Sequence, residues 1–197
     1  MIHETVVSTL SPHGVLHLAP MGVRYEGEGE GDAARVLLMP FKPSKTLDNI
    51  LATRTAVLNL TDDVRIFAGC VTGRREWPTV ALEGFHGHRL ADTLAHAELT
   101  LDAGLDDALR PVLRMRRGRV ETHGVFAGFN RAQAAVIEAA VLVSRLAMLP
   151  REKVESEMEY LQIAIDKTAG PAELEAWDWL YAAVTQFHAL QQVGERP

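Results

Sequence analysis

The sequence predicts an α+β protein in which the strands come first and the helices follow. Up to about Asn130, short runs of β-branched and apolar residues alternate with turn-forming residues, which is the pattern of strands. Beyond Asn130, apolar residues recur at three- and four-residue spacing, which is the pattern of amphipathic helices. Strands grouped ahead of helices favour α+β over alternating βαβ units. We therefore expect a β-rich domain at residues 1–129 and a helical segment at 130–197.

The predicted strands open with a hairpin. Thr5 to Thr9 carry β-branched or small side chains, the turn residues Ser11 to Gly14 follow, and a second strand starts at Val15. The Gly- and Glu-rich stretch 26–32 is expected to be a solvated loop.

Further strands and a short helix are expected in the rest of this part. The segment 90–101 fits both a helix face and a strand, and we favour the strand because Asp102 to Gly104 end it and another alternating run follows. In that run, the arginines are expected to form one exposed face. The expected elements are strands at 36–39, 56–60, 90–101 and 112–121, and a helical segment at 46–51.

Three helices are predicted after Asn130. The first is expected to run until shortly before Pro150, because a residue that precedes proline disfavours helical geometry. The second spans about 152–167 and is closed by Gly170 and Pro171. The third spans about 172–193.

Composition excludes several classes of protein. The formal net charge of −6 argues against a nucleic-acid binder, which needs Lys and Arg to neutralise phosphates. No apolar run is long enough to span a membrane, and the N-terminus lacks the pattern of a secretory signal, so we expect a cytoplasmic protein. Cys70 is the only cysteine, which excludes an internal disulfide, and we expect it to be a buried small hydrophobe.

Hydroxyl and cationic residues precede the helical segment at 46–51. Ser44, Lys45 and Thr46 stand at its predicted N-terminus, and Asn49 follows one turn later. Free N–H groups, the positive end of the helix dipole and a lysine are what a phosphate monoester needs. The alternative is that Ser44 or Thr46 is an ordinary helix cap beside solvated lysines.

A second group lies at the end of the second strand. Here a proline and a glycine are expected to interrupt the ladder, which would leave backbone groups free to bind the edge of a planar heterocycle with Met21 on its face. The alternative is a simple β-bulge. The residues are Ala19, Pro20, Met21, Gly22 and Val23.

Single residues complete the set of candidates. Asn59 ends a buried strand and can present an amide to a ligand. Arg131 lies in the first turn of a predicted helix, where a cation opposes the dipole unless it has an anionic partner.

A metal site is the weakest candidate. His86 and His88 would share one side of an extended segment, but they need a third ligand. His96, Glu121 and His123 are the choices for that ligand. Gly84 and Gly87 favour a mobile loop instead, and we assign no metal site.

Taken together, these motifs resemble a family of uncharacterised FMN-binding split β-barrel proteins, the domain of unknown function 447 type, which is related to the flavin reductases. The resemblance covers almost the whole chain and depends on the order of its motifs. The motifs are 4–9, 19–23, 43–46 with Asn49, 59–63, and 129–132 leading into 136–139. The loop at 26–32 and the three C-terminal helices lie outside the minimal flavin reductase barrel.

The resemblance implies a flavin reductase-like split barrel at 1–129, with FMN as the cofactor. Residues 19–23 would lie along the isoalloxazine ring, and Ser44, Lys45 and Thr46 would hold the 5′-phosphate. Thr9, Asn49 and Asn59 are further candidates, and Arg131 is the next candidate for the phosphate. No catalytic residue is assigned, because the flavin itself would carry the hydride chemistry.

The resemblance also implies a function and an assembly. The chain would be an oxidoreductase that passes electrons from a reduced nicotinamide or another donor through FMN to a small acceptor. The alternative is a flavin-binding carrier, sensor or assembly protein without turnover. A homodimer is expected, with FMN near the subunit interface and the C-terminal helices packed on the barrel or at that interface.

Overall fold

The computed structural model describes residues 1–27 and 34–194, which fall into two compact units. The barrel unit comprises residues 1–62 and 75–126, and the helical unit comprises residues 63–74 and those from 127 onward. The elements are β1 (His3–Leu10), β2 (Leu16–Glu26), β3 (Arg35–Leu38), α1 (Lys45–Thr53), β4 (Thr55–Leu60), α2 (Arg65–Val71), β5 (Thr79–Ala81), β6 (His88–Leu90), β7 (Ala95–Leu105), β8 (Val112–Thr122), α3 (Arg131–Val143), α4 (Arg151–Thr168) and α5 (Pro171–Gly194).

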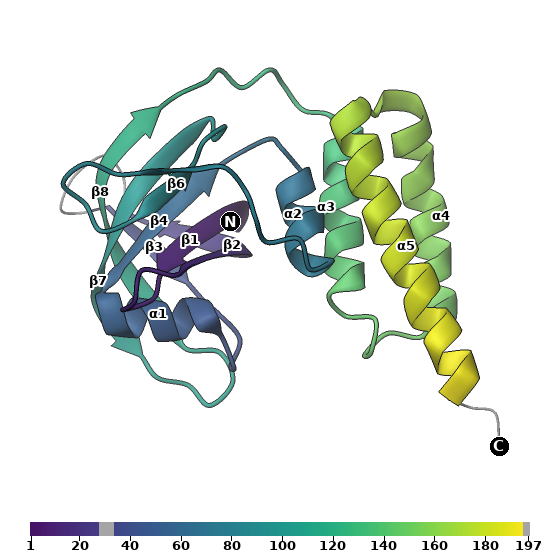
Figure 1. Cartoon of the computed structure of the whole chain (residues 1–197), viewed down its shortest axis with the longest axis horizontal. Helices are drawn as coiled ribbons and strands as arrows, with labels where there is room; N and C mark the ends of the chain where they lie inside the picture. Colours follow the sequence, from purple (N-terminus) through teal and green to yellow (C-terminus); the bar gives the residue numbers. More distant parts are fainter. Residues whose placement is uncertain (28–33, 195–197) are drawn as a thin grey trace. The chain divides into compact units, whose positions relative to one another are not determined.

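Six strands close into a barrel in the order β1-β2-β3-β8-β7-β4, and β4 returns to β1 (Figure 1). All neighbouring strands run antiparallel. The predicted α+β class is confirmed, and so is the strand at 90–101, since β7 occupies most of it and extends beyond it. Closure of the barrel pairs most of the edges that an open sheet would leave exposed.

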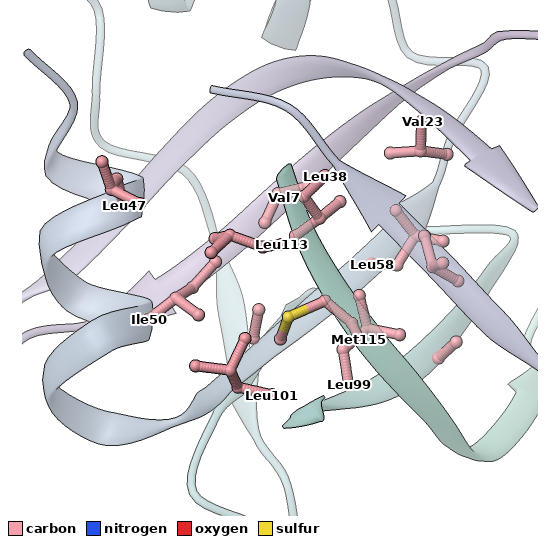
Figure 2. Close-up of a cluster of buried hydrophobic side chains, with 13 residues drawn as sticks. Val7, Val23, Leu38, Leu47, Ile50, Leu58, Leu99, Leu101, Leu113 and Met115 are labelled. Atoms are coloured by element: carbon pink, nitrogen blue, oxygen red, sulfur yellow. The ribbon is translucent and has the colours of Figure 1, made fainter. Parts of the chain in front are cut away.

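The barrel core follows from alternation along the strands. Leu99, Leu113 and Met115 point inward from β7 and β8, and the charged residues between them remain outside or half-buried. Helix α1 contributes Leu47 and Ile50 to the same core (Figure 2). Because these two side chains are three residues apart, they share one face of the helix. The helix is thereby fixed to the barrel, and its N-terminus is positioned with it.

The structure corrects the expectation for residues 19–23. Strand β2 is continuous, and its pairing with β1 runs without a break from His3↔Val23 to Leu10↔Leu16. Neither an interruption nor a bulge is present, although Pro20 stands opposite Val6. The ladder tolerates this proline because a strand whose other side is unpaired loses little when one N–H is missing.

A hairpin of β5 and β6 lies where a mobile loop was expected. It covers the outer face of β1 and β4, where the Leu90 N–H donates to Asn59 Oδ1 at 2.8 Å. The Ser8 hydroxyl also donates to the His88 carbonyl. A Cβ at Gly87 would meet Val57 Cγ2 at 2.6 Å, so this glycine permits close packing of the hairpin.

The helical unit contains one helix that sequence periodicity did not indicate. Helix α2 packs against α3 and α5, although β4 precedes it and β5 follows it in the chain. It carries Cys70, which is half-buried and not the fully buried hydrophobe expected. Helix α3 ends at Val143, earlier than expected, and turns cover the next residues up to Pro150.

The solvated loop expected at 26–32 falls mostly outside the described residues. Of that segment, Glu26 is the last residue of β2, and Gly27 follows it with a φ of 77°. Within the part of the chain that is described, none of the helices combines the length and apolar character needed to cross a bilayer.

Candidate functional site: a cationic helix terminus beside strand β2

Helix α1 and the hairpin β1–β2 meet at buried polar side chains. The Asn49 amide donates to the Thr9 hydroxyl at 3.0 Å, and both residues are buried. Thr9 pairs with His17 across the β1–β2 ladder, so His17 lies on the same face. This arrangement brings the predicted residues Thr9 and Asn49 together and adds His17.

The N-terminus of α1 is capped by Ser44, as expected. Its hydroxyl accepts a hydrogen bond from the Leu47 N–H at 3.2 Å, and its backbone is extended. Lys45 is exposed, whereas Thr46 is buried. Among the described residues, no hydrogen bond uses the backbone N–H groups of Lys45 and Thr46, so the helix start combines free donors with an exposed ammonium group.

Two cations lie close enough to His17 to lower its pKa, and one of them, Lys45, stands in the first turn of α1. Burial lowers the pKa of His17, and the positive charges of Arg75 and then Lys45 lower it further. Within the described residues, neither Lys45 nor Arg75 forms an ion pair with a carboxylate. Because neither cation is neutralised by an ion pair, although Asp48 stands in the first turn of α1, both can interact with a bound anion. We call His17, Lys45 and Arg75 the cationic cluster.

Strand β2 has an edge beside the cationic cluster that β3 does not cover. Strand β3 pairs with β2 only from Val23 to Glu26, so among the described residues no strand pairs with that side of β2 from Ala19 to Gly22. The predicted residues Ala19, Pro20 and Met21 lie along this stretch and are half-buried. Such an edge offers backbone hydrogen-bonding groups to a flat ligand.

Two members of the 19–23 group are constrained by neighbours. The Thr5 hydroxyl donates to the Met21 carbonyl at 2.8 Å. A Cβ at Gly22 would meet Ile2 Cγ2 at 2.8 Å, so the N-terminal residues approach this glycine closely. Val23 is fully buried in the barrel core. The accessible part of the group is therefore Ala19 to Met21.

The structure does not join Asn59 and Arg131 to this group. The Asn59 amide is fully buried, donates to the Val6 carbonyl and the Ser8 hydroxyl, and accepts from the Leu90 N–H. These bonds connect β4 to β1 and β6. Both the NH2 group and the oxygen of the Asn59 amide therefore have partners within the protein. Arg131 is exposed in the first turn of α3 and belongs to the helical unit.

Sequence reasoning missed His17 and Arg75. His17 stands two residues before Ala19 and four before Met21, so the period of a strand already places these three on one face. No local pattern indicates a role for Arg75. It follows α2 in the sequence, and only the fold shows that the chain re-enters the barrel unit at this residue.

Family models match most of the chain. The N-terminal domain of a protein of unknown function, DUF447, matches residues 3–124, and a second model of the same protein matches residues 130–182.

The chain belongs to the DUF447 family.

A solved structure of the same family is similar over nearly the whole length. It is an FMN-bound protein of Methanosarcina mazei, 22% identical, with a TM-score of 0.79 over 92% of this chain and 94% of that one. The curated proteins contain no match to this sequence.

Two further solved structures resemble a smaller part of this DUF447 protein. The 2-nitrobenzoate 2-nitroreductase of Pseudomonas fluorescens is 19% identical, with a TM-score of 0.53 over 61% of this chain and 64% of that one. The styrene monooxygenase flavin reductase of Pseudomonas putida S12 is 11% identical, with a TM-score of 0.51 over 62% of this chain and 82% of that one. The fold is thus a flavin reductase-like split barrel followed by C-terminal helices, as the resemblance implied.

Proposed function

We propose that this DUF447 protein binds FMN and acts as an oxidoreductase that passes electrons from a reduced nicotinamide or another donor to a small acceptor. One observation carries the proposal: Lys45, in the first turn of α1, and Arg75 both act on the charge of His17, and neither cation has a carboxylate partner among the described residues. A phosphate monoester is close to doubly charged at neutral pH and matches this cluster in sign.

The residues present fit the two halves of FMN. Lys45, Arg75 and the α1 N-terminus would hold the 5′-phosphate, and Ser44 and Thr46 frame that helix start. The open edge of β2 at Ala19 to Met21 would hydrogen-bond the rim of the isoalloxazine ring. Bound FMN would supply the hydride chemistry, and the chain's own residues would orient it and leave one face open to donor and acceptor.

A homodimer is part of the proposal. Exposed apolar residues border the helix start: Phe41 is 53% and Leu109 is 61% exposed. The Lys42 N–H donates to the Leu109 carbonyl at 2.9 Å, which holds their two segments together. An apolar surface of this kind next to a ligand site favours burial by a second copy. FMN would then lie near the interface.

The first experiment is the visible absorption spectrum of the purified protein, before and after addition of FMN and then of NADH or NADPH without oxygen. We expect flavin bands that bleach on addition of the nicotinamide. Tight FMN binding without bleaching by either nicotinamide would favour the carrier, sensor or assembly alternative. A colourless protein that FMN cannot saturate would refute the cofactor.

A further inference from the structure

Two histidines and a glutamate converge on one outer patch of the barrel, away from the core. His96 of β7 pairs directly with Glu121 of β8, so the two side chains lie on the same face of the sheet. His123 stands two residues after Glu121 and returns to that face, because side chains alternate along an extended chain. One ligand atom from each of the three lies within 4.8 Å of the others. We call these residues the His–Glu–His cluster.

The backbone that carries the cluster is fixed. The His123 N–H donates to the Leu94 carbonyl at 2.7 Å, and the Gly124 N–H donates to the same carbonyl. The ladder pairs Ala95 with Thr122 beside this anchor. The side chains therefore meet because of strand register, not because of chance loop geometry.

His96 is the buried member and is incompletely satisfied. It is 0% exposed, and its Nε2 atom has no hydrogen-bond partner among the described residues. A buried polar atom without a partner in a native protein usually indicates a strained or functional position. Burial lowers the pKa of His96, the nearby His123 lowers it further, and Glu121 opposes the shift. A neutral imidazole is the form that ligates metals.

The contact between the two rings is a hydrogen bond. His96 Nδ1 and His123 Nε2 are 2.8 Å apart, and the ring planes differ by only 9°. Since nearly parallel planes with nitrogens this close cannot be a van der Waals stack, the rings lie side by side and share one N–H. The ring centroids are 5.0 Å apart, which agrees with a head-to-head contact.

We propose that His96, Glu121 and His123 form a binding site for a divalent first-row transition-metal ion of the zinc type. Two imidazoles and one carboxylate are a common set of three protein ligands, and they leave one position for water or a substrate. The ion binds in place of the hydrogen bond between His96 Nδ1 and His123 Nε2, and the shared proton moves to the other nitrogen of the ring that carries it, so both imidazoles stay neutral. The proposal does not depend on FMN binding.

Binding requires a modest contraction of the cluster. Zinc–nitrogen distances of ~2.0 to 2.1 Å put neighbouring ligand atoms about 3.3 Å apart in a tetrahedron, whereas the present spread is up to 4.8 Å. Glu121 and His123 are exposed and can turn about their side-chain bonds, while His96 stays fixed by burial.

The surrounding charges allow a cation. Arg119 lies nearby, but its guanidinium is paired with Glu98 at 2.8 Å. The Arg89 guanidinium donates to the Leu90 and Ala91 carbonyls. Glu121 supplies the negative charge that an ion needs.

The structure also separates this cluster from the histidine pair that the sequence suggested. His86 is exposed, and His88 Nδ1 lies 3.4 Å from the Thr79 hydroxyl. The sequence suggested His96, Glu121 and His123 only as a third ligand for that pair. Within the described residues they instead form a ligand set by themselves.

The test is calorimetric titration of the full-length, chelator-treated protein with Zn²⁺, with the metal content checked by elemental analysis. We expect one saturable site per chain. Glu121→Gln and His123→Ala, both at exposed positions, are expected to weaken Zn²⁺ binding by at least about tenfold, a loss typical even of indirect disturbance of such sites. His86→Ala is the matched control and is expected to leave binding unchanged.

Three results would overturn the proposal. The first is the absence of saturable Zn²⁺ binding in the folded protein. The second is unchanged binding in both cluster variants, and the third is loss of binding in the His86 variant alone. The zinc titration measures metal binding alone, so a negative result would not contradict the proposed FMN binding. Likewise, a protein that does not bind FMN would not contradict the proposed metal site.

Discussion

The barrel unit carries two polar clusters of opposite character. The cationic cluster joins His17, Lys45 and Arg75, with no carboxylate partner for either cation among the described residues. The His–Glu–His cluster surrounds a buried imidazole with a second imidazole and the carboxylate Glu121. In both, burial is the largest cause that lowers the pKa of a histidine.

The difference between the clusters lies in the charge that completes each of them. Around His17 the fold gathers positive charge, which selects an anion such as a phosphate. Around His96 it gathers lone pairs and one negative charge, which selects a cation. A histidine with a lowered pKa therefore does not identify a ligand by itself, and its neighbours decide the ligand class.

The largest expected effect is on FMN affinity at the cationic cluster. Replacing both Lys45 and Thr46 with alanine is expected to weaken FMN binding by about 2 to 4 kcal/mol, from ~1.5 to 3 kcal/mol for a hydrogen bond to a charged group and incomplete additivity. Fluorescence titration of FMN measures it. Lys153→Ala in α4 is the control, and Zn²⁺ binding is expected to stay the same. Unchanged FMN affinity would move the phosphate site elsewhere, with Arg131 next.

Asn49 tests whether the helix start depends on a buried polar contact. Its amide donates to the Thr9 hydroxyl at 3.0 Å. Asn49→Ala leaves that hydroxyl without its donor and is expected to lower the free energy of unfolding by about 1 to 3 kcal/mol. Urea denaturation measures the change. Asp48→Ala, exposed on the same helix, is expected to change stability by less than about 0.5 kcal/mol; equal effects would contradict the role of Asn49.

Ser44 separates capping from anion binding. Ser44→Ala removes the side-chain cap and is expected to cost about 0.5 to 2 kcal/mol of stability. Ser44→Asp keeps a good cap but adds a negative charge at the helix start, so stability is expected to be retained while FMN affinity falls. Thermal unfolding and FMN titration measure the two effects. If FMN binds Ser44→Asp as tightly as the original chain, the phosphate does not lie at this terminus.

The smallest expected effect is a pH dependence at His17. Burial and the charges of Arg75 and Lys45 lower its pKa in the folded chain, whereas the unfolded value is about 6.5. Between the two values the unfolded chain binds more protons, so stability rises with pH across this window and falls as pH drops below about 6.5.

His17→Gln is expected to flatten that part of the profile. Denaturation midpoints at pH about 5 and about 7.5 measure it, because these values lie on either side of the start of the window. His13→Gln, in the exposed hairpin turn, is the control and is expected to keep the slope. An unchanged slope in His17→Gln would show that His17 does not titrate as its surroundings indicate.

Local patterns predicted much of this fold but not its long-range pairings. Strand alternation located the N-terminal hairpin, and three- and four-residue spacing located the C-terminal helices. Helix α2 was missed because its seven residues are too few for a periodic pattern to stand out. The prediction that Pro20 and Gly22 interrupt the second strand was wrong. Pairing with β1 continues through both residues, although proline and glycine have low β-propensity.

The candidate sites show the same division. The Ser44 cap was predictable, since a serine before a helix start has a local signature. Asn59 carried a polar side chain at a strand end, but only the packed hairpin β5–β6 reveals that its amide is used within the chain. The single residue His96 gave no signal that it would meet Glu121 and His123.

The sequence by itself determined that strands precede the three C-terminal helices, and it determined the start of α1 and the absence of an internal disulfide, because these depend on neighbours along the chain or on composition. The tertiary structure alone decided which charges stand together. Strand pairing brings His96 to Glu121, and the return of the chain from α2 to the barrel unit brings Arg75 near His17, although each pair is tens of residues apart in the sequence. Electrostatic interactions act through distance in space, and closure of the barrel sets that distance.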